Sequence, residues 1–297
     1  MKNNGKHVDL RDSADFIRIV REPDSASAFY NVFEFYPNGT NKLIGKSSFI
    51  DPLRLEEQCI TYYKNGHKQK TCTYKNGQLI NNEYDYYPNG KLYQAKQFPA
   101  DGKYYNELEN NFLLTECLDS LGTKLVTNGN GHYVGYDDDF KKTTKEGDIK
   151  NGKRDGLWKG RFDEVHTRFE ENYANGVLIS GTATLDGGKI NTYTKARMIA
   201  PEFKGGIEAF GRYLSRKIEY PYTARRDNIE GRVVLSFVVE KNGQVTEIKV
   251  QTAVNPELDN EAIRVLKESP IWVPGKRFGV PVRVIYSVPI NFALNGN

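Results

Sequence analysis

A recurring turn signal constrains this chain more than any other feature. An Asn-Gly pair, in most cases preceded by an aromatic residue, occurs at residues 38–39, 65–66, 76–77, 89–90, 151–152 and 175–176. Asn-Gly favours the tight turn of a β-hairpin because both residues tolerate positive φ. The aromatic residues supply a face for packing in a sheet. Residues 29–198 are therefore predicted to form successive antiparallel hairpins in one repetitive sheet.

The last hundred residues mix strands with helices. Residues 232–240 alternate apolar with polar side chains, as expected of a strand with one buried face. Asn242-Gly243 predicts a hairpin turn with positive φ at both residues, followed by a returning strand at 245–252. A final long strand is predicted from Val280 to Phe292.

Two amphipathic helices complete this region. Ile207, Phe210 and Leu214 share one predicted helical face. Asn255 and Pro256 predict a helix start, because Asn caps the first turn and Pro lacks an N–H that would be unpaired there. The C-terminal order is thus α-β-β-α-β, and the whole chain is predicted to be α+β.

Several motifs of this region occur together in a known order. They are Pro201-Glu202-Phe203, Tyr220-Pro221, Ile229–Val233, Asn242–Val245, Leu258-Asp259, Trp272 with Pro274-Gly275, and Pro289-Ile290. In this order they resemble the C-terminal domain of the energy transducer TonB, in its Bacteroidetes-type form. The resemblance covers residues 199–297. It implies a cell-envelope protein that binds the TonB box of TonB-dependent outer-membrane receptors in support of energy-coupled transport.

The hairpin region resembles a second family. Tyr87–Lys91 and Gly147–Trp158 are similar to the MORN-type repeats of bacterial envelope and antitoxin-like proteins, which implies a scaffold or an interaction surface. A polar N-terminal arm with a strand-like stretch at Phe16–Val20 precedes it. The predicted domains are therefore residues 1–28, 29–198 and 199–297.

The final strand is the first candidate binding site. Pro289 has no N–H to offer a ladder, so this strand is predicted at a sheet edge. An exposed edge can bind an extended peptide by strand addition, and the resemblance implies that the TonB box binds in this way. The candidate residues are Val282, Val284, Tyr286 and Val288. The alternative is an edge that Pro289 and Arg283 keep unpaired, as a protection against aggregation.

Tyr220-Pro221 is the second candidate. The resemblance implies that this pair lies beside the docked TonB box. The alternative is a helix stop, in which Pro221 keeps Tyr220 out of the α region and the ring covers the helix end. Arg225 and Arg226 are candidates for steering an acidic peptide, or else belong to a solvated helix face.

Other classes of function find no support in the residues. The net charge of +4 comes without the basic stripe that binds phosphates, so no nucleic acid is expected. Gly147–Arg154 approaches a phosphate-binding loop, but Arg154 replaces the Ser or Thr that would hold magnesium, and hairpin signals surround it, so a turn is predicted. Neither a nucleophile elbow nor metal-ligand spacing occurs. We therefore predict a non-enzymatic protein with no cofactor and no metal.

The three cysteines, Cys59, Cys72 and Cys117, cannot all pair within one chain. Cys59 and Cys72 flank one predicted hairpin, so a bridge between them is geometrically feasible. Buried free thiols are the alternative.

No apolar run reaches the length of a membrane span, and Met1–Leu10 has no signal-peptide core. The family implies the periplasm, so either a leader is missing from this sequence or the protein is a soluble relative. An inner-membrane energising complex and a second copy of the chain are further expected partners. A rival hypothesis is a structural or assembly scaffold whose hairpin repeats bind a protein or lipid, with the C-terminal domain only dimerising.

Overall fold

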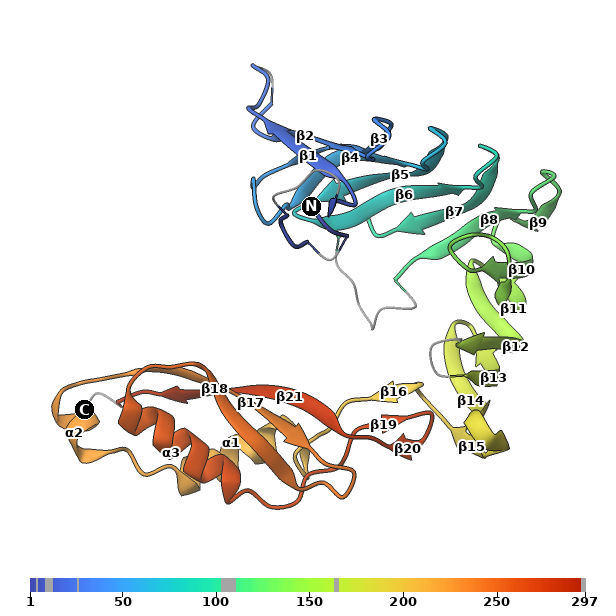
Figure 1. The fold of residues 1–297 in the computed structure, drawn as a ribbon. Helices are drawn as coiled ribbons and strands as arrows, with labels where there is room; N and C mark the ends of the chain where they lie inside the picture. The colour runs from blue at the N-terminus through green and yellow to red at the C-terminus, as the bar shows by residue number, and fades with distance from the viewer. Residues whose placement is uncertain (4, 9–12, 26, 103–110, 163–165, 295–297) are drawn as a thin grey trace. The chain divides into compact units, whose positions relative to one another are not determined.

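The structure is a computed structural model that describes residues 1–3, 5–8, 13–25, 27–102, 111–162 and 166–294. The chain divides into two compact units, Met1–Ile179 and Ser180–Asn297. The first unit consists of hairpins, and the second contains the helices (Figure 1).

One antiparallel sheet of 15 strands follows the chain in strict sequence order from β1 to β15. Its strands are β1 (Ile17–Arg21), β2 (Tyr30–Phe35), β3 (Asn41–Ser47), β4 (Leu55–Tyr62), β5 (Lys68–Lys75), β6 (Gln78–Tyr86), β7 (Leu92–Phe98), β8 (Leu113–Leu118), β9 (Lys124–Thr127), β10 (Asn130–Tyr136), β11 (Thr143–Lys150), β12 (Lys153–Phe162), β13 (Thr167–Ala174), β14 (Val177–Thr184) and β15 (Ile190–Tyr193). A 3-10 turn, η3 (Asp186–Gly188), connects the last two. The repetitive hairpin sheet expected from the turn signals is thus present.

Three Tyr-x-Asn-Gly turns connect β2 to β3, β4 to β5 and β6 to β7. Hydrogen bonds join them into what we call the turn ladder. The hydroxyls of Tyr36, Tyr63 and Tyr87 donate to the carbonyl oxygens of Tyr62, Tyr86 and Leu118, at 2.9, 2.6 and 2.9 Å. The amides of Asn38, Asn65 and Asn89 donate to the carbonyl oxygens of Lys64, Pro88 and Ser120, at 3.2, 2.8 and 3.1 Å. Each turn is therefore tied to the next one along the sheet.

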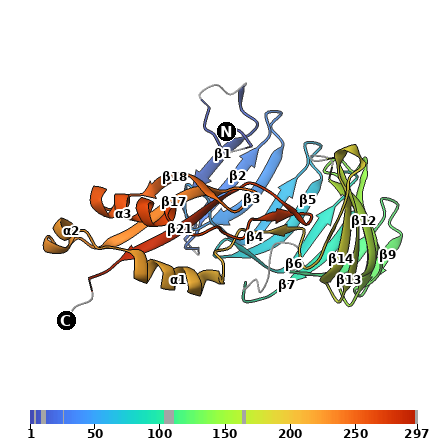
Figure 2. The same cartoon turned by 90° about the horizontal axis from the view of Figure 1, so that it is seen from below.

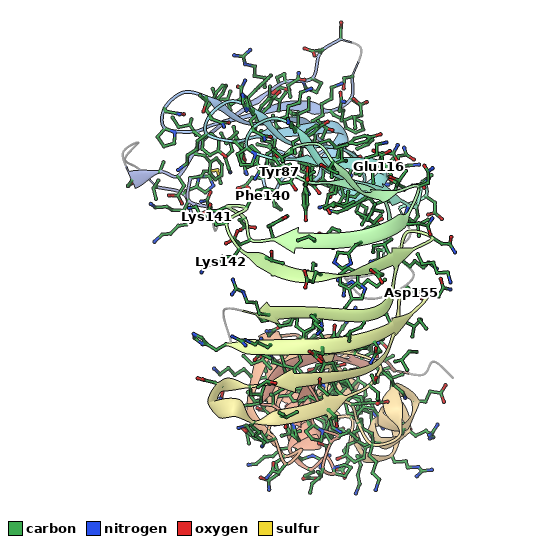
Figure 3. The ribbon with its side chains drawn as sticks, turned by 90° about the vertical axis from the view of Figure 1, so that its right-hand side faces the viewer. Tyr87, Glu116, Phe140, Lys141, Lys142 and Asp155 are labelled. Carbon is green, nitrogen blue, oxygen red and sulfur yellow. The ribbon has the colours of Figure 1, made fainter. Side chains whose placement is uncertain are left out.

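The sheet bends toward one face between β7 and β10. Strands three places apart lie about 14 Å from each other in a flat sheet. The hydroxyls of Tyr93 on β7 and Tyr133 on β10 are nevertheless hydrogen-bonded at 2.9 Å. Tyr87 packs against Phe140 with their ring centroids 4.7 Å apart, and Figure 3 shows these two side chains together. Aromatic rings therefore pack against one another on the inner side of the bend.

Two of the cysteines face each other across a hairpin. Cys59 on β4 is paired directly with Cys72 on β5. Both thiols are free and buried, as is that of Cys117. The alternative of buried free thiols is the one that the structure shows.

The last part of β14 and all of β15 fall within the second unit and continue the 15-stranded sheet. After them come two three-stranded sheets, in the orders β18-β17-β21 and β16-β19-β20. The further elements of this unit are β16 (Met198–Ile199), α1 (Gly206–Lys217), α2 (Tyr222–Arg226), β17 (Gly231–Val239), β18 (Val245–Thr252), α3 (Pro256–Lys267), β19 (Lys276–Arg277), β20 (Val280–Pro281) and β21 (Val284–Phe292). Figure 2 shows β17, β18 and β21 side by side. The predicted order α-β-β-α-β omits α2 and the small sheet, whose strands are too short to give a periodic signal.

Both long helices pack into one core with the β18-β17-β21 sheet. Phe210 of α1 and Leu258 of α3 belong to the same buried cluster as Phe237 of β17. The Tyr213 hydroxyl of α1 donates to the Val265 carbonyl of α3 at 2.9 Å, so the two helices contact each other. The predicted cap of α3 is confirmed, because Asn255 Oδ1 accepts the Glu257 N–H at 2.8 Å.

Three details of the second unit differ from the sequence predictions. Ile207 is 76% exposed, because it lies in the first turn of α1, beyond the stretch that packs. The predicted strand Val280–Phe292 is interrupted, since β20 pairs with β19 and only β21 pairs with β17. Asn242 lacks positive φ and only Gly243 has it, because Asn242 Oδ1 accepts the Gln244 N–H and fixes a different turn.

In the part of the chain that the structure describes, none of the helices combines the length and apolar character needed to cross a membrane.

Candidate functional site

The strand β21 lies at one edge of its sheet, as the position of Pro289 predicts. It pairs with β17 in unbroken register from Val284 opposite Val239 to Phe292 opposite Gly231. The sheet order β18-β17-β21 leaves its other side without a strand partner among the described residues. The main-chain groups along that side are a template for an added strand.

The predicted residues of β21 turn their side chains inward. Val288 is only 5% exposed, and Tyr286 and Val284 are half-buried. The Tyr286 ring packs edge-on against Phe237 and Trp272, with ring centroids 6.0 and 6.1 Å apart. These side chains fix the strand on the core, and their neighbours of opposite parity face outward.

Two residues that the sequence analysis did not single out occupy the outer parity, Ile285 and Ser287. Ile285 is 74% exposed. Pro289 has the same parity and has no N–H, so this set of main-chain groups points to the free edge, away from β17. Alternation along the strand was the signal that would have identified them.

Val282 lies outside β21, and its N–H donates to the Gly275 carbonyl at 2.8 Å. The next residue, Arg283, forms ion pairs with Glu240, at 2.9 Å, and with Glu247. These contacts connect the start of β21 to the β17–β18 hairpin. Val282 therefore belongs to the anchored approach to the strand.

Tyr220 lies at the opposite end of β21. Its ring meets Phe292 edge-on, with centroids 5.8 Å apart, and its hydroxyl donates to the Ile229 carbonyl at 2.5 Å. Burial and the nearby Glu230 carboxylate raise the pKa of the Tyr220 hydroxyl, while Arg225 opposes them. Pro221 is the N-cap of α2, so it begins a helix, and the preceding helix α1 has already ended at Lys217.

The two arginines beside Tyr220 have different surroundings. The Arg225 guanidinium lies 5.8 Å from the centre of the Tyr220 ring. Arg226 forms an ion pair with Asp227 at 2.7 Å. Only Arg225 is thus placed against the predicted aromatic residue, at the Phe292 end of β21. The structure does not bring Tyr220 next to Val282, because the full length of β21 separates them.

These features define a class of small α+β domain, in which two helices pack with a three-stranded antiparallel sheet whose edge strand β21 has no outer strand partner among the described residues. Residues 216–294 match the family model of the Gram-negative bacterial TonB protein C-terminal. This part of the chain is therefore a TonB C-terminal domain, and the match leaves the hairpin sheet outside it.

Two solved structures are similar to a part of the chain. Both are NMR solution structures of the Helicobacter pylori TonB C-terminal domain, each 26% identical to this chain with a TM-score of 0.25. The alignments cover 31% of this chain and 82% or 96% of those chains. No curated protein matches the chain.

Proposed function

We propose that this protein acts in the periplasm by binding an outer-membrane TonB-dependent receptor, whose TonB box adds as a strand to the free edge of β21. One observation carries the proposal: among the described residues, β21 has a strand partner along one side only. By their parity with Pro289, the main-chain groups of Ile285 and Ser287 point to the other side. The TonB C-terminal domain at residues 216–294 supports the choice of partner. Energy coupling through an inner-membrane complex is part of the same proposal.

The geometry specifies what the peptide contacts. Along Val284–Val288, main-chain hydrogen bonds to the peptide supply the affinity, and the exposed Ile285 supplies an apolar side-chain contact. Pro289 removes one hydrogen-bond donor from the edge of β21. From Val284 to the Phe292 end, where Tyr220 lies, the strand spans about 25 to 30 Å. A peptide that contacts both ends must therefore extend past Pro289.

An NMR titration of the ¹⁵N-labelled full chain with a synthetic TonB-box peptide tests this proposal. We expect shifts at the amides of Ile285 and Ser287. Two peptides N-methylated at alternate residues should then differ, since an added strand directs only every second N–H toward β21. Equal binding of both N-methylated forms contradicts strand addition.

The variant Ser287→Pro removes one outward N–H, whereas Ser287→Ala keeps it and removes only the hydroxyl. We expect about a tenfold loss of peptide affinity for the proline variant, the equivalent of one good hydrogen bond, and less than about twofold for the alanine control. In a Trp158→Phe background, the fluorescence of Trp272, which is buried in the core beneath Tyr286, reports whether each variant keeps its fold. The rival scaffold function predicts no response of the β21 amides to the peptide.

A further inference from the structure

The first unit contains a cavity of about 890 Å³, a size typical of small-molecule sites. It lies on the inner side of the bend, where strands distant in the sheet order contribute to one wall. Gln94 of β7, Tyr133 of β10 and Trp158 of β12 all line it, together with the turns at Gly152 and Gly176. The sheet thus forms a site that no single hairpin contains.

The charged residues of the cavity wall all have the same sign. Lys96, Lys145, Lys153 and Arg154 line the cavity, and no carboxylate does so among the described residues. Lys96 is already held from behind by Glu83 at 2.8 Å and by Asp85 at 2.7 Å. Behind the wall, the Tyr173 hydroxyl donates to the buried carboxylate of Glu171 at 3.0 Å. The charges that line the cavity itself are nevertheless all positive, and this favours an anion inside it.

The position of one of these cations is fixed by the aromatic wall. The Arg154 guanidinium lies over the rings of Trp158 and Tyr173, at 4.8 and 5.3 Å from their centres. Its Nη1 donates to the Tyr173 hydroxyl at 2.9 Å. Because an arginine is held in this geometry, little side-chain entropy remains to be lost on binding.

Apolar rings occupy the rest of the wall. Tyr133 stacks on Trp158 with centroids 5.8 Å apart. Phe98 and Phe112 form a second pair at 5.5 Å. Such surfaces favour a ring or apolar body, and the amides of Gln97 and Asn175 add hydrogen-bonding groups.

We propose that this cavity binds a small organic anion, one that carries a carboxylate or phosphate group on a ring-shaped or apolar body. The anionic group lies against Lys145, Lys153 and Arg154, and the body lies against the aromatic rings. The near phosphate loop at Gly147–Arg154 contributes its last two basic side chains to this wall, although its backbone forms a hairpin turn and not a strand-to-helix loop.

The two tryptophans give the test an internal reference. Trp158 lines the cavity, and Trp272, the other tryptophan of the chain, is buried in the second unit. The full chain labelled with 5-fluorotryptophan is titrated with benzoate, phenyl phosphate and the neutral isostere benzamide, and followed by ¹⁹F NMR. We expect saturable shifts of the Trp158 resonance with at least one anion, with Trp272 unchanged and benzamide at least about tenfold weaker. The stronger of the two anions identifies the acidic group.

A matched pair of double variants separates the cavity from general surface charge. Lys145→Met/Lys153→Met removes two cations from the wall. Lys150→Met/Lys159→Met removes two exposed cations from the same strands, β11 and β12, neither of which lines the cavity. The first pair of substitutions should lower the affinity for the anion at least about tenfold, and the second pair less than about twofold. No shift of Trp158 with either anion, equal binding of benzamide, or equal losses in both pairs overturns the proposal.

Discussion

Replacing the tyrosines of the turn ladder by phenylalanine tests whether each turn is held by its neighbour. Tyr36→Phe, Tyr63→Phe and Tyr87→Phe each remove one hydroxyl donor and change little else. A hydrogen bond of this kind contributes about 0.5 to 1.5 kcal/mol to the free energy of unfolding. Tyr87 is only 4% exposed, so water cannot easily replace its hydroxyl at the Leu118 carbonyl. We therefore expect Tyr87→Phe to be the most destabilising of the three, at about 1 to 2 kcal/mol.

The measurement is urea unfolding of the full chain in a Trp272→Phe background, where the only remaining tryptophan, Trp158, reports on the first unit. Tyr84→Phe is the control, because Tyr84 is more exposed and outside the ladder; its effect should stay within about 0.5 kcal/mol. Tyr36 and Tyr87 share no contact in the ladder, so the effects of their substitutions should add. If Tyr87→Phe costs no more than Tyr84→Phe, the ladder does not stabilise the sheet.

Three further predictions concern single sites. Gly147→Ala places a Cβ 2.5 Å from the Trp158 ring. It should therefore lower the free energy of unfolding by about 1 to 3 kcal/mol in the same urea assay, and an unchanged free energy would show that the ring can move. Burial alone would raise the pKa of Glu261, but hydrogen bonds from Arg264 and a backbone N–H lower it below 4.5. As the pH falls, the unfolded chain takes up this proton before the folded chain does, so the free energy of unfolding should fall below about pH 4.5. Glu261→Gln should therefore make the free energy of unfolding less dependent on pH in the acid range of a pH series of unfolding curves. Burial raises the pKa of Cys117 to about 12, so little of the reactive thiolate is present at neutral pH. In a Cys59→Ser/Cys72→Ser background, Ellman's reagent should therefore react slowly with Cys117 until urea unfolds the chain. Rapid reaction of the folded protein would contradict the burial.

The turn signals located the hairpins but did not fix their geometry. Asn76 and Asn151 have positive φ, as a two-residue turn requires. Asn65 does not, because its side chain accepts the His67 N–H and only Gly66 takes positive φ. The same dipeptide therefore forms two kinds of turn, and the side-chain hydrogen bond two residues on decides between them.

The bend in the sheet could not be inferred from local patterns. Period-two alternation says which side chains share a face, but it says nothing about contacts between strands that are not neighbours. Tyr93 and Tyr133 are 40 residues apart, and their hydroxyls meet although β8 and β9 lie between their strands in the sheet order. The cavity depends on this bend, so its cationic wall was visible in the sequence only as scattered lysines.

Pro289 predicted that the final strand lies at a sheet edge, and the alternation of side chains along that strand says which residues face outward. Alternate side chains of a strand lie on opposite faces of the sheet, so one set can pack on the core while the other set faces outward. Val288 and its neighbours of inner parity bury apolar surface, and this holds the edge in place. Ile285 and Ser287, at outer parity, remain accessible to a ligand.

Anchoring at both ends makes this edge suited to binding an extended segment. Arg283 fixes one end of β21 through Glu240 and Glu247, and Phe292 fixes the other against Tyr220. A strand that is already ordered costs an incoming peptide little additional entropy, so most of its main-chain hydrogen bonds appear as affinity. The same preorganisation would favour pairing with any exposed strand. Pro289 limits that risk by interrupting the ladder, which confines strong pairing to the Val284–Val288 half and makes a short peptide the best-matched partner.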